Sequence, residues 1–254
     1  MMKITDAHSH LMVKFLMYRE AGVEQNIQMM KKGGIDRACL FTSDFLSTDG
    51  SLTPKAWEER MNRKIAESVE SHPTRLVGFG TVDPRIEGAA ERLDSFVAKY
   101  GFRGAKFHPW HQDFPCGDVM HPIMEVAARH RLPIVFHSGT PVYAQPLAIA
   151  WLAEYFPDVP IVLAHMGLTC MYVDAVHAAK RYENVFLETS CMPYTPVLER
   201  AVSELGPHKI LFGTDTPFLY PYIEILRIQR LAINDDDKEM ILGGNIERLI
   251  DRSA

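Results

Sequence analysis

Eight short apolar runs recur along the chain, and their regular spacing limits the possible folds more than any other feature. Each run is rich in Val, Ile, Leu and Phe, and consecutive runs start roughly 25 to 40 residues apart. Short runs that are apolar on both faces are typical of strands in a parallel sheet covered by helices. The runs lie at residues 3–7, 37–42, 75–81, 104–107, 132–136, 160–164, 184–187 and 209–212.

Segments with a helical repeat of apolar residues lie between these runs. The clearest is 86–100, where Gly101 follows as a stop signal. Segments 58–71, 119–130 and 171–182 have a similar pattern or lack helix breakers. An eightfold alternation of strand and helix predicts an α/β fold, a closed (β/α)8 TIM barrel. A doubly wound open sheet is the alternative, but it usually has fewer units and a Gly-rich first turn that is missing here.

The remaining segments complete the predicted domain. Residues 235–250 predict one extra C-terminal helix, because the three aspartates at 235–237 suit the positive N-terminal end of a helix. The longest connection with turn residues, 43–55, follows the second run on the face where barrel enzymes carry lids; a plain loop is equally compatible. No linker-like stretch interrupts the pattern, so we expect residues 1–254 to form a single domain.

The composition is that of an ordinary folded protein, with 47% hydrophobic and 23% charged residues in a chain of 254. The net charge of -5 and the lack of a basic run argue against a nucleic-acid partner. The N-terminus turns polar too early for a signal peptide, and no stretch approaches about 18 apolar residues, so we expect no membrane contact. Four scattered cysteines without a Cys-x-x-Cys pair indicate reduced thiols in a cytoplasmic protein.

Seven polar residues fall at the ends of predicted strands. His8 and His10 lie two apart, so both side chains share one face of the first strand. In a barrel every strand end faces the same central cavity, so side chains that follow different strands converge there. The seven residues are His8, His10, Lys106, His108, His137, His165 and Asp215.

A divalent metal ion is the natural organiser of such a group. Buried imidazoles and a carboxylate lose hydration energy unless something binds them. His nitrogens and Asp oxygens bind Zn²⁺ and similar ions at about 2.0–2.2 Å. Three protein ligands or slightly more, with an open position for water, are typical of a catalytic site rather than a structural one.

Five motifs carry a resemblance to a known family. They are DAHSH at 6–10, GAKFHP at 104–109, FHSG at 136–139, AHMG at 164–167 and FGTDTP at 212–217. Together they resemble the amidohydrolase-related branch of the amidohydrolase superfamily, and ILGGN at 241–245 resembles a C-terminal segment common in it. His-x-His alone is a weak signal, whereas the ordered set after strands one, five, six and eight is highly specific. The resemblance implies a metal-dependent TIM-barrel enzyme, in a branch that includes hydrolases and non-oxidative decarboxylases.

The resemblance also implies roles for individual residues. His8, His10 and His137 would be metal ligands, and Asp215 would lie at or near the metal. Asp215 would also be the base that takes a proton from metal-bound water, whose pKa the metal lowers towards about 7. His165 would either polarise the substrate's carbonyl oxygen or complete the metal shell. Zn²⁺ is the expected ion, with Mn²⁺ as an alternative.

Lys106 and His108 are the ambiguous members of the set. In other branches of the superfamily a fourth-strand lysine is carboxylated and bridges two metals. Lys106 could do this, could hold a substrate carboxylate as a point charge, or could pair structurally with Asp6. We favour one metal ion with Lys106 in a substrate role. His108 would support a ligand or contact the substrate.

The main functional hypothesis is hydrolysis of a carbonyl, lactone or amide-type bond in a small, carboxylated molecule. A decarboxylase on the same scaffold is the alternative, although family decarboxylases tend to be longer than 254 residues. A TatD-like nuclease is disfavoured, because the third strand lacks the Glu that such proteins place there. A barrel that has lost catalysis and serves as a binding or scaffold protein is also disfavoured, because a suitable residue stands at every position expected to bind metal. A homodimer is the base-rate expectation for assembly.

Cys116, Cys170 and Cys191 also fall near predicted strand ends. A thiol nucleophile needs a neighbouring base and a lowered pKa, and the sequence supplies neither specifically. No role is therefore predicted for these thiols.

Overall fold

The computed structural model describes residues 3–11, 22–43 and 52–253. Within these residues, eight strands lie at the eight predicted places. They are β1 (Thr5–Leu11), β2 (Arg37–Thr42), β3 (Leu76–Gly78), β4 (Ala105–Phe107), β5 (Ile134–His137), β6 (Ile161–Ala164), β7 (Val185–Glu188) and β8 (Ile210–Leu211). The expected strand pattern is therefore confirmed, with two ends that differ in ways that matter for the site.

All paired strands run parallel, in the orders β1-β2-β3 and β4-β5-β6-β7-β8. Backbone contacts join the two groups on both sides. Gly80 pairs with Ala105 beyond the end of β3, and the Lys106 amide donates to the Gly80 carbonyl. Ser9 of β1 pairs with Thr216 beyond β8. The two sheets are thus parts of the expected TIM barrel.

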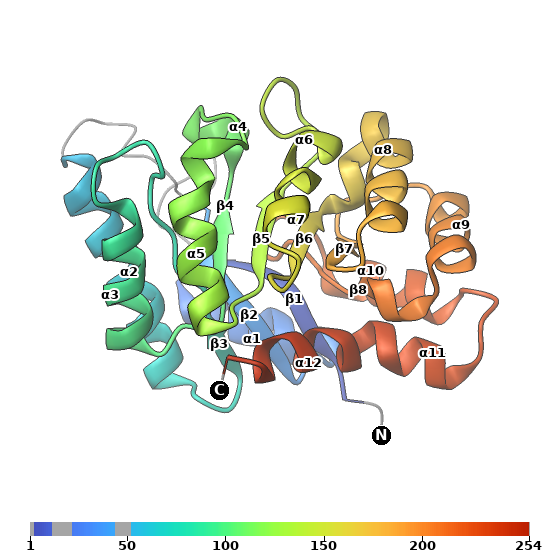
Figure 1. Cartoon of the computed structure of the whole chain (residues 1–254). Helices are drawn as coiled ribbons and strands as arrows, with labels where there is room; N and C mark the ends of the chain where they lie inside the picture. The colour runs from blue at the N-terminus through green and yellow to red at the C-terminus, as the bar shows by residue number, and fades with distance from the viewer. Residues whose placement is uncertain (1–2, 12–21, 44–51, 254) are drawn as a thin grey trace.

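Helices surround the strands, as Figure 1 shows. Between strands, apolar faces such as Leu93, Phe96 and Val97 of α3 are buried against the core. The helices are α1 (Val23–Gly33), α2 (Pro54–Ser71), α3 (Ala89–Tyr100), α4 (Pro109–Gln112), α5 (His121–His130), α6 (Pro146–Ala150), α7 (Leu152–Tyr155), α8 (Leu168–Arg181), α9 (Thr195–Leu205), α10 (Pro221–Gln229), α11 (Asp235–Glu239) and α12 (Asn245–Asp251).

The C-terminal helix expected over 235–250 is present, but it is not α-helical throughout. α11 and α12 are separated by a π-helical turn at Met240–Gly244. A β-carbon on Gly243 would lie 2.8 Å from the Lys3 carbonyl oxygen, so glycine is what lets this turn approach the start of β1. The tail thereby packs across the end of the barrel where the strands begin, opposite α4 in Figure 1.

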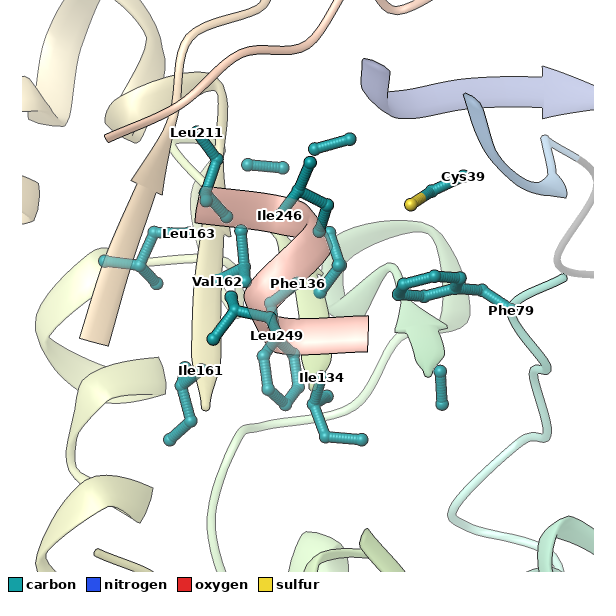
Figure 2. Packing of buried hydrophobic residues seen from close by; sticks show 14 of the residues in the cluster. Cys39, Phe79, Ile134, Phe136, Ile161, Val162, Leu163, Leu211, Ile246 and Leu249 are labelled. Atoms are coloured by element: carbon teal, nitrogen blue, oxygen red, sulfur yellow. The ribbon is translucent and has the colours of Figure 1, made fainter. Parts of the chain in front are cut away.

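One buried cluster fills the barrel and extends beneath the helices. Figure 2 shows Ile246 and Leu249 of α12 among strand residues such as Val162 and Leu211, and all four belong to this cluster. Burial of each such side chain contributes about 1.5–3 kcal/mol relative to exposure. The end where the strands begin, which we call the lower end, is therefore apolar. The opposite end, which we call the upper end, is available for polar side chains.

The predicted lid region is described only in part. Residues 44–51 of the 43–55 connection lie outside the described residues. The segment ends at the start of α2, where the Thr53 hydroxyl accepts a hydrogen bond from the Ala56 amide and Pro54 occupies the first turn. Within the described part of the chain, no helix is both long enough and apolar enough to cross a membrane.

Candidate metal centre

His8, His10 and Asp215 meet at the upper end of the barrel. β1 continues to Leu11, so both histidines lie inside the strand rather than at its end. The Asp215 amide donates to the His8 carbonyl, and the His10 amide donates to the Thr216 carbonyl. These backbone bonds fix the segment after β8 against β1. They place a carboxylate beside two imidazoles that share one strand face.

The distances between the three side chains fit a shared cation. The Nε2 atoms of His8 and His10 are 3.1 Å apart. Asp215 Oδ1 lies 3.2 Å from His8 Nε2 and 3.0 Å from His10 Nε2. Ligand atoms about 2.0–2.2 Å from one ion are separated by roughly these spacings. The donor set therefore fits a divalent metal.

Glu188 is a functional candidate that the sequence reasoning missed. Its Oε2 lies 2.7 Å from His8 Nδ1, and both side chains are fully buried. The expected run ended at residue 187, whereas β7 continues one residue to Glu188. A carboxylate that immediately follows a buried run was the available signal. This contact fixes the His8 ring so that Nε2 points towards His10 and Asp215. Carboxylates beside metal-bound histidines orient those rings in the same way.

The charges in this cluster are strongly coupled. Burial acts to raise the pKa of Glu188, but His8 outweighs it and lowers that pKa to about 2. Burial and Lys106 act to lower the pKa of His8, yet Glu188 and Asp215 prevail and raise it. Hydrogen bonds from His10 and His8 likewise overcome burial and hold the pKa of Asp215 well below its usual range. Asp215 is therefore an ionised carboxylate, able to bind a cation.

His165 lies beside this group, directly after β6. Its Nδ1 is 2.9 Å from the Ser190 hydroxyl oxygen, and its backbone amide donates to Glu188 Oε2. The ring centroid is 4.7 Å from that of His8 and 4.9 Å from that of His137. Burial holds the pKa of His165 well below its usual range, so the imidazole is neutral. A neutral ring with one nitrogen engaged leaves the other for a substrate or a cation.

His137 and His108 form a stacked pair at the ends of β5 and β4. Their ring centroids are 3.8 Å apart with 12° between the planes. His137 Nε2 is buried and has no hydrogen-bond partner among the described residues. Burial lowers the pKa of both rings well below the usual range, which leaves them neutral. A buried, uncommitted imidazole nitrogen is suited to a metal ion, although His137 does not join the tight group around His8.

Three groups of potential ligands emerge from the described residues, each with its ligand atoms within 4.8 Å of one another. The first is His8, His10 and Asp215; the second is His8, His165 and Glu188; the third is His165, Cys191 and Asp215. His8, His165 and Asp215 are each shared by two groups. The predicted ligand His137 belongs to none of the three, so its role stays a prediction.

Lys106 reaches into the same cluster from β4. Its side chain is 1% exposed, with Nζ 3.3 Å from His8 Nε2 and 4.6 Å from the Phe41 ring centroid. Burial lowers the pKa of Lys106 to about 8. Asp6 does not pair with it, because Asp6 accepts hydrogen bonds from Thr214 and the His8 amide instead. The structural alternative of a Lys106–Asp6 pair is therefore wrong.

Exposed apolar side chains lie in the segments that follow the strands at the same face. Trp110 follows β4, Val142 follows β5, Tyr194 follows β7 and Tyr220 follows β8. Each is at least 47% exposed. Phe114, by contrast, is fully buried and packs edge-on to Phe107. The apolar side chains at this face thus divide into core packing and an exposed apolar rim.

Comparison with known proteins places this geometry in a family. The sequence profile of the amidohydrolases matches residues 5–252. The chain belongs to the amidohydrolase family. It is 27% identical over 245 residues to a gamma-resorcylate decarboxylase of Polaromonas sp., covering 75% of this chain and 74% of that protein. A gamma-resorcylate decarboxylase of Rhodococcus jostii is 27% identical over 217 residues, covering 63% of this chain and 65% of that protein.

Solved structures of the family share the amidohydrolase fold seen here. A dihydroxybenzoic acid decarboxylase of Polaromonas sp., with manganese and 2-nitroresorcinol bound, superposes with a TM-score of 0.80 at 20% identity. That comparison covers 100% of this chain and 98% of the other. A 2,6-dihydroxybenzoate decarboxylase from Rhizobium has a TM-score of 0.78 at 18% identity, with both chains fully covered.

This amidohydrolase is an enzyme by its family and relatives. The comparisons support the decarboxylase alternative better than hydrolysis, which they do not confirm. Both curated relatives are decarboxylases, although the length of this chain favoured hydrolysis. Manganese in a solved neighbour supports a divalent metal but not zinc specifically.

Proposed function

We propose that this amidohydrolase is a metal-dependent, non-oxidative decarboxylase of a small hydroxylated aromatic carboxylate. The observation that carries the proposal is the meeting of His8, His10 and Asp215 within 3.0–3.2 Å, in a chain similar to gamma-resorcylate decarboxylases. Metal-dependent hydrolysis remains the second candidate, because an ionised Asp215 beside a cation site would equally activate water.

His8, His10, His137 and Asp215 would hold one divalent ion. When bound, the ion would supply a Lewis acid that stabilises negative charge on substrate oxygens. Nitrogen and carboxylate donors accept either Zn²⁺ or Mn²⁺, and a manganese-containing neighbour makes Mn²⁺ the first ion to test. Glu188 would keep the His8 ring oriented for binding through its 2.7 Å contact with Nδ1.

Lys106 would help to bind the substrate anion. Its amine lies 3.3 Å from His8 Nε2, a proposed ligand nitrogen, and would therefore reach a substrate anion held at the metal. The proposal keeps Lys106 as a free amine rather than as a carboxylated bridge between two metals. A buried ammonium attracts a carboxylate strongly because little water screens the pair. His108, stacked on His137, would lie on the same side of the metal centre. The exposed apolar rim, including Trp110 and Tyr220, would admit a flat aromatic ring.

Asp215 would move the proton that decarboxylation requires. As a carboxylate it would accept the proton of a substrate hydroxyl and then return it to the ring carbon. The bond from that carbon to the carboxyl carbon breaks, CO₂ leaves, and its bonding electrons take up the proton. Neutral His165, whose ring centroid lies 4.7 Å from that of His8, would donate or accept a hydrogen bond at a substrate oxygen.

The partners implied are small molecules, without nucleic acid or membrane. Two further expectations stay with the proposal: a cytoplasmic location and assembly as a homodimer.

An NMR time course separates the two reactions. The metal-free protein is loaded with Mn²⁺ or Zn²⁺ and incubated in D₂O with 2,6-dihydroxybenzoate and related hydroxybenzoates, and in parallel with aryl lactones and amides; metal is removed before spectra are recorded. The proposal expects metal-dependent loss of carboxylate with one deuteron appearing at the vacated ring carbon. Turnover of lactones or amides alone would replace the proposal with hydrolysis. Turnover that survives in Asp215→Asn would contradict the assigned proton transfer.

A further inference from the structure

The thiol of Cys191 lies at the metal centre but has no part in the proposed reaction. Cys191 follows β7, and its Sγ donates to Asp215 Oδ2 at 3.1 Å. The other carboxylate oxygen, Oδ1, faces His8 and His10. The two oxygens of Asp215 thus point to two different sets of potential ligands. A carboxylate with this arrangement is suited to bridge two cations, which in two-metal sites lie about 3.5–4 Å apart.

A ring nitrogen of His165 completes the second set. Ligand atoms of His165, Cys191 and Asp215 lie within 4.8 Å of one another. His165 Nδ1 already contacts Ser190, so Nε2 is the nitrogen left for a cation. The set therefore offers one nitrogen, one sulfur and one oxygen, whereas the first set offers nitrogen and oxygen only.

The backbone places these three residues in an unusual way. His165, Cys191 and Asp215 all have positive φ, at 64°, 59° and 55°. Residues other than glycine adopt this left-handed region at an energetic cost, and such residues cluster at functional sites. Three separate loops, after β6, β7 and β8, thus adopt the same costly conformation and bring their side chains together.

We propose that His165, Cys191 and Asp215 form a second, inhibitory site for a thiophilic divalent cation such as Zn²⁺, Cd²⁺ or Co²⁺. On binding, the S–H bond of Cys191 breaks and a sulfur–metal bond forms. The thiol proton, which is hydrogen-bonded to Asp215 Oδ2 in this structure, leaves to solvent. The site takes His165 and one oxygen of Asp215 away from the substrate. Inhibition of catalysis therefore rests on the proposed function, whereas cation binding does not.

The sulfur atom gives the second site its selectivity. Thiolate ligands favour zinc and other soft or borderline ions, whereas manganese favours oxygen and nitrogen. A Mn²⁺-loaded enzyme would therefore keep the second site open. Zinc would fill the first site and, at higher concentration, the second.

Optical titration with Co²⁺ tests cation binding directly. In the full-length, metal-free protein, the first equivalent should give weak visible bands from nitrogen and oxygen ligands. The second should add an intense near-ultraviolet band from sulfur-to-cobalt charge transfer. Cys191→Ser should lose that band and keep the visible bands. Cys170→Ser is the matched control, because Cys170 is exposed on α8, and it should keep both.

The possible outcomes are separable. No charge-transfer band at several equivalents, or a band that persists in Cys191→Ser, would overturn the second site. Absent visible bands at one equivalent would instead overturn the first centre. Cys191→Gly removes the thiol and fits the positive φ, so it keeps the test valid should the serine variant fold poorly.

Inhibition supplies the second readout. Cd²⁺ added to the Mn²⁺-loaded enzyme should inhibit the wild type, and the concentration for half inhibition should rise about tenfold or more in Cys191→Gly. Each variant is compared with its own uninhibited rate. Equal inhibition of both proteins would contradict the regulatory part of the proposal, even where the cobalt spectra support the site.

Discussion

The two ends of the barrel are built from the same strands but from opposite kinds of residue. At the lower end, Ile246 of α12 and Ile134 of β5 are fully buried in one apolar cluster. At the upper end, His8, Lys106 and Glu188 are equally buried, yet they are ionisable. Apolar burial stabilises the fold, whereas buried charges lose hydration and need partners. We infer that the lower end stabilises the fold and that the upper end is arranged to bind a cation.

The backbone follows the same division. His165, Cys191 and Asp215 at the upper end adopt positive φ without being glycine. At the lower end, Gly243 lets the tail approach β1 closely because it has no side chain to collide with the backbone there. Non-glycine residues with positive φ thus gather at the upper end, whereas at the lower end Arg131, before β5, has one.

The largest expected effect is on activity at the upper end. Asp215→Asn removes the carboxylate charge that would bind the cation and carry the proton. We expect kcat/KM to fall by about 10³-fold or more, measured by steady-state assay on the substrate that the NMR screen identifies. Asp236→Asn on exposed α11 is the matched control and should leave the rate unchanged. An active Asp215→Asn protein would mean that the upper end works without this carboxylate.

At the lower end, the expected effect is on stability alone. Ile246→Ala leaves a cavity beneath the barrel and should lower the free energy of unfolding by about 2–5 kcal/mol, measured by urea denaturation of the metal-free protein. Metal bound per folded chain should not change. A loss of metal binding together with stability would show that the two ends are not independent.

Glu188→Gln tests the orientation of His8. The amide keeps the size of the side chain but removes the charge that faces His8 Nδ1. We expect the affinity for metal to fall about 10- to 100-fold, measured by competition with a chelator. Glu125→Gln on the exposed face of α5 serves as control. Unchanged affinity would remove Glu188 from the account of the metal centre.

The smallest effect compares two neighbouring glycines in the tail. A β-carbon at Gly243 would lie 2.8 Å from a backbone oxygen, so Gly243→Ala should destabilise the protein by about 1–3 kcal/mol. Gly244 has no atom closer than 3.7 Å in the same test, and Gly244→Ala should be neutral or stabilising by up to about 1 kcal/mol. Thermal unfolding of both variants measures the difference. Equal destabilisation would contradict the close packing of the tail on β1.

Much of this architecture follows from local pattern. Eight apolar runs predicted eight strands, because a parallel strand buried on both faces leaves a visible run. Because the strand ends of a barrel face one central cavity, the sequence also predicted that His8, His10, His165 and Asp215 lie close together, although they come from segments far apart in the chain. Glu188 escaped only because the seventh run was ended one residue early.

Other features depend on contacts that no local pattern records. The π-helical turn at Met240–Gly244 forms where the tail meets β1, so its cause lies at the other end of the chain. The link between Asp6 and Thr214 joins β1 to the segment after β8. Cys191 reaches Asp215 because two loops fold towards each other, a relation that spacing alone does not show.

The metal content of the protein shows whether His8, His10 and Asp215 bind an ion. The protein is purified without chelator, reconstituted with Mn²⁺ or Zn²⁺ at one equivalent, desalted, and measured by elemental analysis beside His8→Ala and Asp215→Asn. The account predicts about one ion per chain in the wild type and its loss in both variants. A wild-type protein that retains no metal, or variants that retain as much as the wild type, would contradict it.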